Sequence, residues 1–255
     1  MRKTIRATLI VSFLVSFLVL TSCATIKTRP QAETKFKGQD FDFYFEQGTS
    51  SLRQGNYGMA IEQFDKAIFL NPNSDKAHNL QGIAYIHLKN YSAAEREFQK
   101  AVHLNLLYLE AYNNLGGVYF LRKQFEKAEE MFKKALSFGP DSISANYSLG
   151  TLLLLLQGRI EEGTRYLTRG IELDPDYLET HKTLTADVRT SSSDQSELYF
   201  TYAKIYAARG DIEKTLEFFQ KARATGFRDW ERVALGEDFE KVREDPRIKD
   251  FLGKK

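Results

Sequence analysis

The chain of 255 residues has little of the chemistry on which metal and redox sites depend, with one cysteine, four histidines and three methionines. A single cysteine cannot form an intrachain disulfide or a thiolate metal cage. No two histidines are spaced i, i+4, so the His-Glu-x-x-His zinc motif is absent. The sequence also lacks a Gly-x-Ser-x-Gly motif, a phosphate-binding loop and a dinucleotide fingerprint. We therefore expect no catalytic residues, no metal and no cofactor, and predict that the protein is not an enzyme.

Charge of one sign is not in excess either. The formal net charge is +2, from 36 basic and 34 acidic side chains. Arg2, Lys3 and Arg6 fall in an N-terminal segment that we expect to be removed, and the rest of the chain has 33 basic against 34 acidic side chains. Nucleic-acid binding needs a clustered basic surface, which the sequence does not show. We expect no nucleic-acid partner.

The two strongest apolar runs, residues 9–20 and 152–156, are shorter than the roughly 20 residues of a membrane-spanning helix. The first follows a short basic start, which is typical of a secretory signal peptide. It leads into Leu20-Thr21-Ser22-Cys23. This ending resembles the bacterial lipobox, in which an aliphatic residue and two small residues precede a cysteine.

The lipobox resemblance implies that Cys23 receives a diacylglyceryl thioether, that cleavage occurs before it, and that its new amine is acylated. Several acyl chains on one residue anchor a protein durably. Ala24 follows, with no aspartate, which resembles lipoproteins sorted to the outer membrane. We expect an extracytoplasmic protein, anchored by lipid in the outer membrane and facing the periplasm. The alternatives are an uncleaved anchor or an ordinary signal peptide with a chance cysteine.

Internal repetition is the strongest pattern in the sequence. Glycine recurs every 34 residues, and alanine and phenylalanine positions keep the same spacing. The recurring residues are Gly48, Gly82, Gly116 and Gly150; Ala60, Ala94 and Ala128; Phe64, Phe98 and Phe132; and Ala67, Ala101 and Ala135. This register resembles the tetratricopeptide repeat, a helix–turn–helix unit of 34 residues. The resemblance implies an all-α protein, a right-handed α-solenoid of stacked repeats with a C-terminal helical cap.

The register also divides the chain. We expect a signal peptide at 1–22, a lipidated cysteine and flexible tether at 23–40, four repeats at 41–177, an odd helix and loop at 178–195, a fifth repeat at 196–228 and the cap at 229–255. In the fourth repeat one residue is inserted near 155–158, which lengthens the helix or the turn. Gly163 and Gly170 replace alanines there, which predicts a weak helix.

The first helix of the third repeat shows how its faces are assigned. Tyr112, Leu115 and Tyr119 recur at i, i+3 and i+7 and predict the core-facing stripe. The neighbouring stripe begins at Asn113 and is expected to face the concave surface, which first helices line in such repeats. The same offsets predict a partner-binding groove lined by Phe45, Leu52, Asn79, Ile83, Ile86, Asn113, Phe120, Tyr147, Thr151 and Leu154.

This groove is expected to be an exposed apolar strip with asparagine amides, which suits an amphipathic helix or an extended peptide of a protein partner. It lacks the lysines and arginines by which chaperone-binding relatives clamp a C-terminal carboxylate, so we expect no such ligand. Alternatively the tether, the helix at 178–189 or a second copy of the chain fills the groove. The last case would make a homo-oligomer.

These expectations together predict a membrane-anchored, non-catalytic scaffold for protein–protein interaction in the periplasm. A similar architecture occurs in the lipoprotein pilotins of type IV pilus secretins, so a pilotin-like assembly factor is an alternative. Another is an accessory of outer-membrane protein assembly or of peptidoglycan-enzyme regulation. An enzyme carrying repeats would need a further domain, and the short segment after the last repeat is too small to build one.

Overall fold

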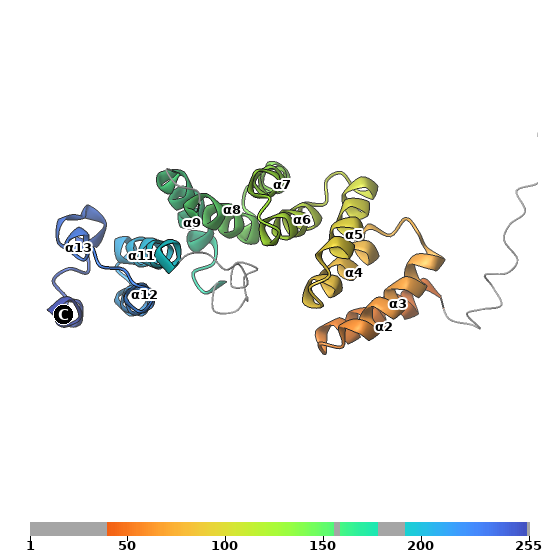
Figure 1. Cartoon of the computed structure of the whole chain (residues 1–255), viewed down its shortest axis with the longest axis horizontal. Helices are drawn as coiled ribbons and strands as arrows, with labels where there is room; N and C mark the ends of the chain where they lie inside the picture. Colours follow the sequence, from red (N-terminus) through yellow and green to blue (C-terminus); the bar gives the residue numbers. More distant parts are fainter. Residues whose placement is uncertain (1–39, 156–158, 178–191, 254–255) are drawn as a thin grey trace, which may run out of the picture. The chain divides into compact units, whose positions relative to one another are not determined.

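The computed structural model describes residues 40–155, 159–177 and 192–253, and within these ranges every regular element is helical (Figure 1). This confirms the all-α prediction. The chain divides into two units, Met1–Asp40 and Phe41–Lys255, and the helices belong to the second. The expected signal peptide, Cys23 and most of the tether lie outside the described residues. Among those residues, no helix combines the length and apolar character that a membrane span requires.

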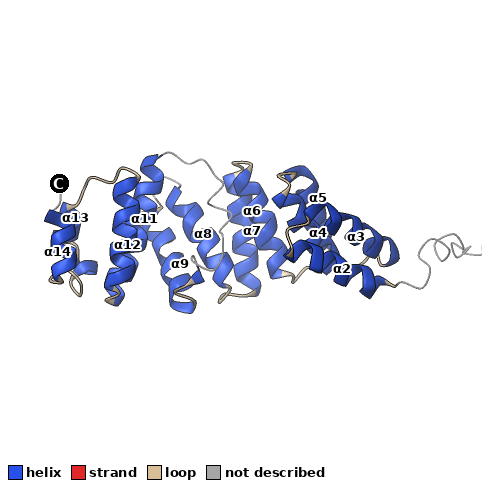
Figure 2. Ribbon diagram, turned by 90° about the horizontal axis from the view of Figure 1, so that it is seen from below, coloured by secondary structure: helices blue, strands red, loops and turns tan. Residues whose placement is uncertain are grey.

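Ten helices of the second unit form five helix–turn–helix pairs (Figure 2). They are α2 (Phe41–Arg53) with α3 (Tyr57–Leu70), α4 (Asp75–His87) with α5 (Tyr91–Leu104), α6 (Leu109–Leu121) with α7 (Phe125–Phe138), α8 (Ile143–Leu155) with α9 (Ile160–Leu173), and α11 (Ser192–Arg209) with α12 (Ile212–Ala224). In the first four pairs, the second helix of one pair packs on the first helix of the next. First helices also contact one another, α2 with α4, α4 with α6, α6 with α8 and α8 with α11, so they share one surface.

Local signals explain where the helices begin and end. Ser74 and Asp211 precede α4 and α12, and each side chain accepts a hydrogen bond from a backbone N–H of the first turn. The turns between paired helices place Gly55, Lys89 and Lys123 at φ values of +77°, +57° and +58°. These positions recur every 34 residues. A residue in the left-handed conformation ends a helix by directing the backbone N–H groups at the turn back to the last carbonyl oxygens of the helix.

Close contact between paired helices explains the recurring glycines. A Cβ atom at Gly48, Gly82 or Gly116 would lie 2.6–2.7 Å from the ring of the phenylalanine sixteen residues later. Those rings are at most 2% exposed. The glycine on the first helix and the phenylalanine on the second therefore form one packing unit, which the 34-residue spacing repeats.

In the fourth repeat the close contact between the paired helices also involves two glycines on the second helix. A Cβ at Gly163 would lie 2.8 Å from the backbone oxygen of Gly150, and one at Gly170 would lie 2.9 Å from the ring of Tyr147. These glycines lower helix propensity, but they also let α9 approach α8 closely, where the Cβ atom of an alanine would clash. The prediction of one residue inserted near 155–158 falls largely outside the described residues, which end at Leu155 and resume at Arg159.

The start of the last pair differs from the sequence-based prediction. α11 begins at Ser192, so Ser192, Ser193 and Asp194 are helical and not part of a loop. Serine and aspartate are favoured at helix N-termini because their side chains can accept hydrogen bonds from the first turn. The odd helix expected at 178–189 lies outside the described residues.

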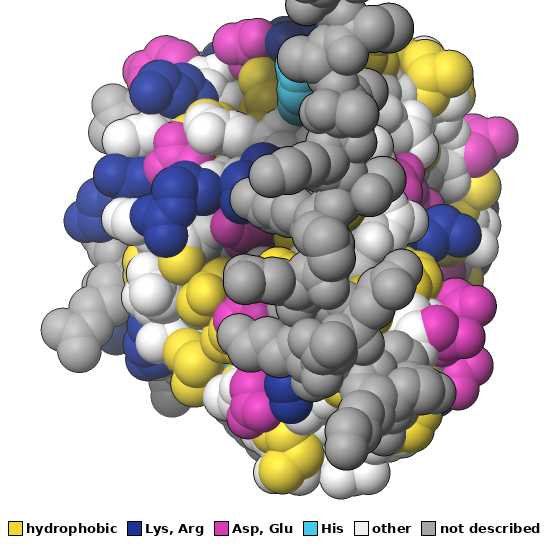
Figure 3. Space-filling model, turned by 90° about the vertical axis from the view of Figure 1, so that its right-hand side faces the viewer, with side chains coloured by type: hydrophobic (Ala, Val, Ile, Leu, Met, Phe, Trp, Pro, Cys, Tyr) yellow, Lys and Arg dark blue, Asp and Glu magenta, His cyan; other side chains and the backbone are white. Residues whose placement is uncertain are grey.

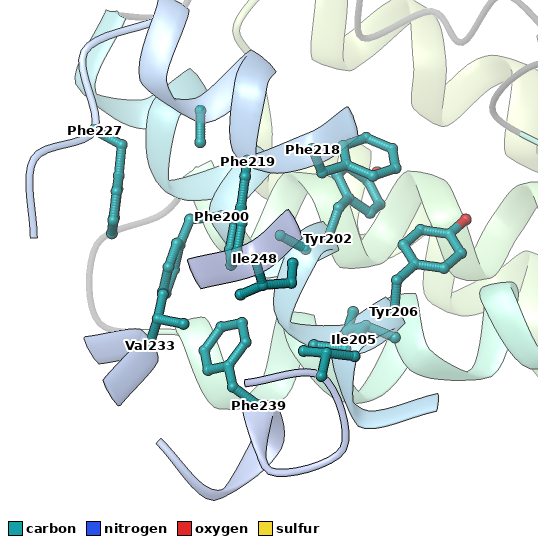
Figure 4. Packing of buried hydrophobic residues seen from close by; sticks show 14 of the residues in the cluster. Phe200, Tyr202, Ile205, Tyr206, Phe218, Phe219, Phe227, Val233, Phe239 and Ile248 are labelled. Carbon is teal, nitrogen blue, oxygen red and sulfur yellow. The ribbon is translucent and has the colours of Figure 1, made fainter. Parts of the chain in front are cut away.

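A short α13 (Glu231–Leu235), a 3₁₀ turn η2 (Glu237–Phe239) and α14 (Pro246–Gly253) follow the last pair. They bury Val233, Phe239, Ile248 and Phe251 against α11 and α12 (Figure 4). Trp230 meets the ring of Phe227 edge to face, with centroids 4.9 Å apart. This segment covers the apolar face of α11 and α12, which would otherwise meet water at the end of the stack.

Charged side chains of both signs occur on the described part of the face in Figure 3. Within the helical unit, charged side chains pair across neighbouring repeats, such as Arg159 with Glu129 at 2.5 Å and Arg169 with Asp141 at 2.6 Å. Exposed pairs of this kind contribute little stability. Many of the opposite charges in this near-neutral chain therefore lie next to each other on the surface.

Candidate functional site

The shared surface of the first helices contains a cavity of about 310 Å³ at α4, α6 and α8. Its lining is rich in amides, hydroxyls and aromatic rings. The lining residues are Asn79, Ile83, Tyr108, Glu110, Asn113, Asn114, Gly117, Phe120, Phe132, Ser144, Tyr147, Ser148, Thr151 and Tyr177. They come from the second, third and fourth repeats, so stacking of the repeats creates the cavity.

The cavity brings together six of the ten groove residues named from the sequence: Asn79, Ile83, Asn113, Phe120, Tyr147 and Thr151. The other four are half-buried outside it. Phe45 and Leu52 pack beside α3, Ile86 beside the core of the middle repeats, and Leu154 beside the cluster that contains α11.

Phe120, Tyr147 and Thr151 are each only 2% exposed, so the expected exposed strip is corrected to a recessed cavity with buried walls. The cause is contact between neighbouring first helices, which covers the stripe next to the core-facing one. Phe120 packs on Phe125 with ring centroids 5.8 Å apart. Tyr147 stacks on Tyr177 at 4.9 Å and donates a hydrogen bond to the backbone oxygen of Asp174.

Sequence reasoning missed the residues one turn earlier on the same face, above all Glu110 on α6 and Ser144 on α8. Each precedes a predicted groove residue by three positions, so extending the stripe toward the helix N-terminus would have found both. Tyr108 and Tyr177 belong to the connections between repeats. No helical period reaches them, and only the fold places them at the cavity.

The amides of the cavity are unequally satisfied. Asn114 Nδ2 donates a hydrogen bond to Asn79 Oδ1 at 3.0 Å. Asn113 is 7% exposed, and its buried Oδ1 has no hydrogen-bond partner among the described residues. A buried acceptor without a donor costs stability. Asn113 therefore brings a buried, unsatisfied acceptor to the wall of the cavity.

The described lining of the cavity carries charge of one sign. Glu110 is exposed and is the one charged side chain among the described residues of the lining. Burial, with added repulsion from Glu110 and Asp75, raises the pKa of Tyr108 to about 12. Burial also raises the pKa of Tyr147 and Tyr177 above the usual range. Tyrosine is neutral at physiological pH even without such a shift, so the described residues of the lining contribute hydrogen-bonding groups and one negative charge.

The remaining candidate groups have structural surroundings. His78 is buried and contacts the Glu97 carboxylate and the backbone oxygen of Pro72. His181 lies outside the described residues. The described residues include no group of three histidine, cysteine or acidic side chains arranged to hold a metal ion.

Two family models match the chain, both described as tetratricopeptide repeat, at residues 45–105 and 109–142. MamA (residues 41 to the end) from Desulfovibrio magneticus superposes with a TM-score of 0.51 at 21% identity, over 74% of this chain and 96% of that one. A thermophilic TPR protein of Thermus thermophilus gives 0.51 at 18% identity, over 83% and 98%.

YrrB, described as a TPR protein with an unusual peptide-binding site, gives a TM-score of 0.50 at 19% identity, over 77% of this chain and 91% of that one. No curated protein sequence matches the chain. At these identities the structures share the fold. Residues 45–105 and 109–142 are therefore tetratricopeptide repeats, and the helical stack that contains them is an α-solenoid of the tetratricopeptide-repeat type.

Proposed function

We propose that this protein is a non-catalytic scaffold that binds an extended segment of a partner protein in the cavity at α4, α6 and α8. The observation that carries the proposal is the buried, unpartnered Oδ1 of Asn113 in a cavity that also contains Asn79 and Asn114. A peptide backbone offers an N–H and a C=O at each residue, and a side-chain amide can accept and donate at once. The peptide-binding site named for YrrB supports this use of the fold.

The proposal predicts that Asn113→Leu separates binding from stability. Leucine has the same branched shape as asparagine and removes the unsatisfied acceptor, so we expect a melting temperature equal to or above that of the wild type. Peptide binding should fall at least tenfold. Retention of a random peptide library on the immobilised protein, together with thermal unfolding followed by circular dichroism, measures the two effects.

Asn146 on α8 supplies the matched control. Its Nδ2 donates to the backbone oxygens of Pro140 and Ser142, each at 2.9 Å, and it does not line the cavity. Asn146→Leu should lower stability by about 1–2 kcal/mol because both side-chain hydrogen bonds are lost, with binding unchanged. If the folded Asn113→Leu variant retained as much peptide as the wild type, the cavity would not be the peptide-binding site.

We also propose that the scaffold is a lipoprotein of the outer membrane, facing the periplasm. The support is the basic start, the apolar run at 9–20, the Leu-Thr-Ser-Cys ending and Ala24. Cys23→Ser should abolish incorporation of radiolabelled palmitate and release the protein from sedimented membranes. Continued labelling of the serine variant would contradict lipidation at Cys23, and inner-membrane density in a sucrose gradient would contradict only the membrane assignment.

Narrower roles fit within this proposal: a pilotin-like factor for a secretin, or an accessory of outer-membrane protein assembly or of peptidoglycan-enzyme regulation. Each would use the same anchor and the same cavity with a different partner. Cross-linking from Ile83, at the wall of the cavity, followed by mass spectrometry of the adduct would identify that partner. A self-adduct would instead identify a homo-oligomer.

A further inference from the structure

We infer that the cavity at α4, α6 and α8 selects a basic side chain, lysine or arginine, of the bound segment. This inference rests on the proposed peptide-binding function and specifies its ligand. It depends on three properties of the cavity: its charge, its unpaired acceptor and its aromatic walls.

The charge of the cavity favours a cation. Among the described residues of the lining there is no lysine, arginine or histidine, and the one charged group is the Glu110 carboxylate. Glu110 is exposed and has no ion-pair or hydrogen-bond partner among the described residues. Asp75 lies close enough to Tyr108 to raise its pKa together with Glu110, so a second carboxylate adds to the negative potential. Carboxylates beside a partly enclosed space attract cations more strongly than they would in open water.

The amide side chains of the lining can receive such a cation. Asn113 Oδ1 is an acceptor with no donor, whereas lysine and arginine side chains offer only donors. Asn79 Oδ1 already accepts from Asn114 and does not compete for the same bond. A carboxylate in this position would meet an acceptor and a negative charge, with no donor cation to offset them.

Aromatic rings provide the rest of the fit. Tyr147 and Tyr177 stack with centroids 4.9 Å apart and line the cavity beside Ser144, and Tyr108 lies on the same lining. A cation over the face of a tyrosine gains electrostatic stabilisation while the ring contacts its methylene stem. A phenol is uncharged at neutral pH even at its ordinary pKa of about 10, and burial raises the pKa of these tyrosines further, so they act through their rings and hydroxyls.

The experiment uses the detergent-solubilised full chain and a random library of N-acetylated, C-amidated octapeptides. The wild type should enrich lysine or arginine at one position of the retained peptides. Replacing that arginine by uncharged citrulline, or that lysine by norleucine, should weaken binding at least tenfold by fluorescence anisotropy. Glu110→Lys should weaken binding of the original peptide to the same extent.

Glu126→Lys is the matched control for Glu110→Lys. Both residues are exposed glutamates in the first turn of a helix, Glu110 in α6 and Glu126 in α7, so the helix-dipole cost of the change is alike. Glu126 does not line the cavity, and its variant should bind within twofold of the wild type. Equal melting temperatures of the two variants would show that Glu110→Lys acts on binding and not on folding.

Two other outcomes would overturn the inference in distinguishable ways. If the wild type retains peptides without basic enrichment, and Glu110→Lys binds them equally, the cavity does not select a cation, although the proposed scaffold function stands. If neither the wild type nor the variants retain any peptide, the proposed function fails and the inference fails with it.

Discussion

Gly116→Ala is expected to lower the free energy of unfolding by about 2–3 kcal/mol, the range of an overpacked core. The new methyl carbon would lie 2.6 Å from the ring of Phe132 and 3.2 Å from the backbone oxygen of Ala128. Neither can retreat freely, because Phe132 is 2% exposed and Ala128 is fully buried. The methyl group would force α6 and α7 apart, which urea unfolding followed by circular dichroism measures.

Gly58→Ala is the control for this change. Gly58 lies in α3, and nothing stands within 4 Å of the place where its Cβ would be. Alanine there should raise stability by about 0.5–1 kcal/mol through helix propensity alone. If both variants gained stability equally, close packing would not explain the glycine that recurs on the first helices. A smaller cost of Gly116→Ala in a Phe132→Leu background would identify the ring as the obstacle.

Glu97→Met is expected to destabilise the protein by about 3 kcal/mol at pH 7, because it breaks a buried pair from one side. His78 Nδ1 lies 2.7 Å from Glu97 Oε2, and the two side chains are 4% and 9% exposed. The other ring nitrogen, Nε2, lies 3.1 Å from the backbone oxygen of Pro72. That oxygen only accepts, so Nε2 carries a hydrogen, and Nδ1 would lose its partner in the variant.

The third repeat supplies the design of the rescue. It has Tyr112 and Met131 where the second repeat has His78 and Glu97, and both are buried in its core. His78→Tyr combined with Glu97→Met should therefore recover most of the lost stability, to within about 1 kcal/mol of the wild type. A double variant as unstable as Glu97→Met would show that the pair contributes more than an apolar replacement can.

The same pair predicts a pH dependence. Burial opposes ionisation of Glu97, but hydrogen bonds from His78 and Lys100 outweigh it and lower the pKa of the carboxyl group. A lowered pKa in the folded protein contributes stability that is complete above the unfolded value, about 4.3, and is lost as pH falls through the folded value. Below about pH 4 the wild type should therefore lose the stability that ionised Glu97 contributes, whereas the double variant, which lacks this carboxyl group, should not.

The sequence alone determined the type of fold and the orientation of the helices within each pair. Glycine, alanine and phenylalanine each recur every 34 residues because they occupy the positions where two paired helices touch. Close contact at these positions restricts the size of the side chain, so the recurrence identifies them. Tyr112, Leu115 and Tyr119 are buried, as their helical period predicts. The period also identified six of the residues that line the cavity.

Tertiary structure decided what the neighbouring stripe does. A helical period states which way a side chain points but not how far the next repeat covers it, since that depends on side-chain volumes from several helices. Phe120 and Tyr147 are buried for this reason, and the exposed strip becomes a cavity. The unpaired Asn113 acceptor and the His78–Glu97 pair have the same origin: each depends on groups brought together, or kept apart, by packing between helices, which no spacing in the sequence records.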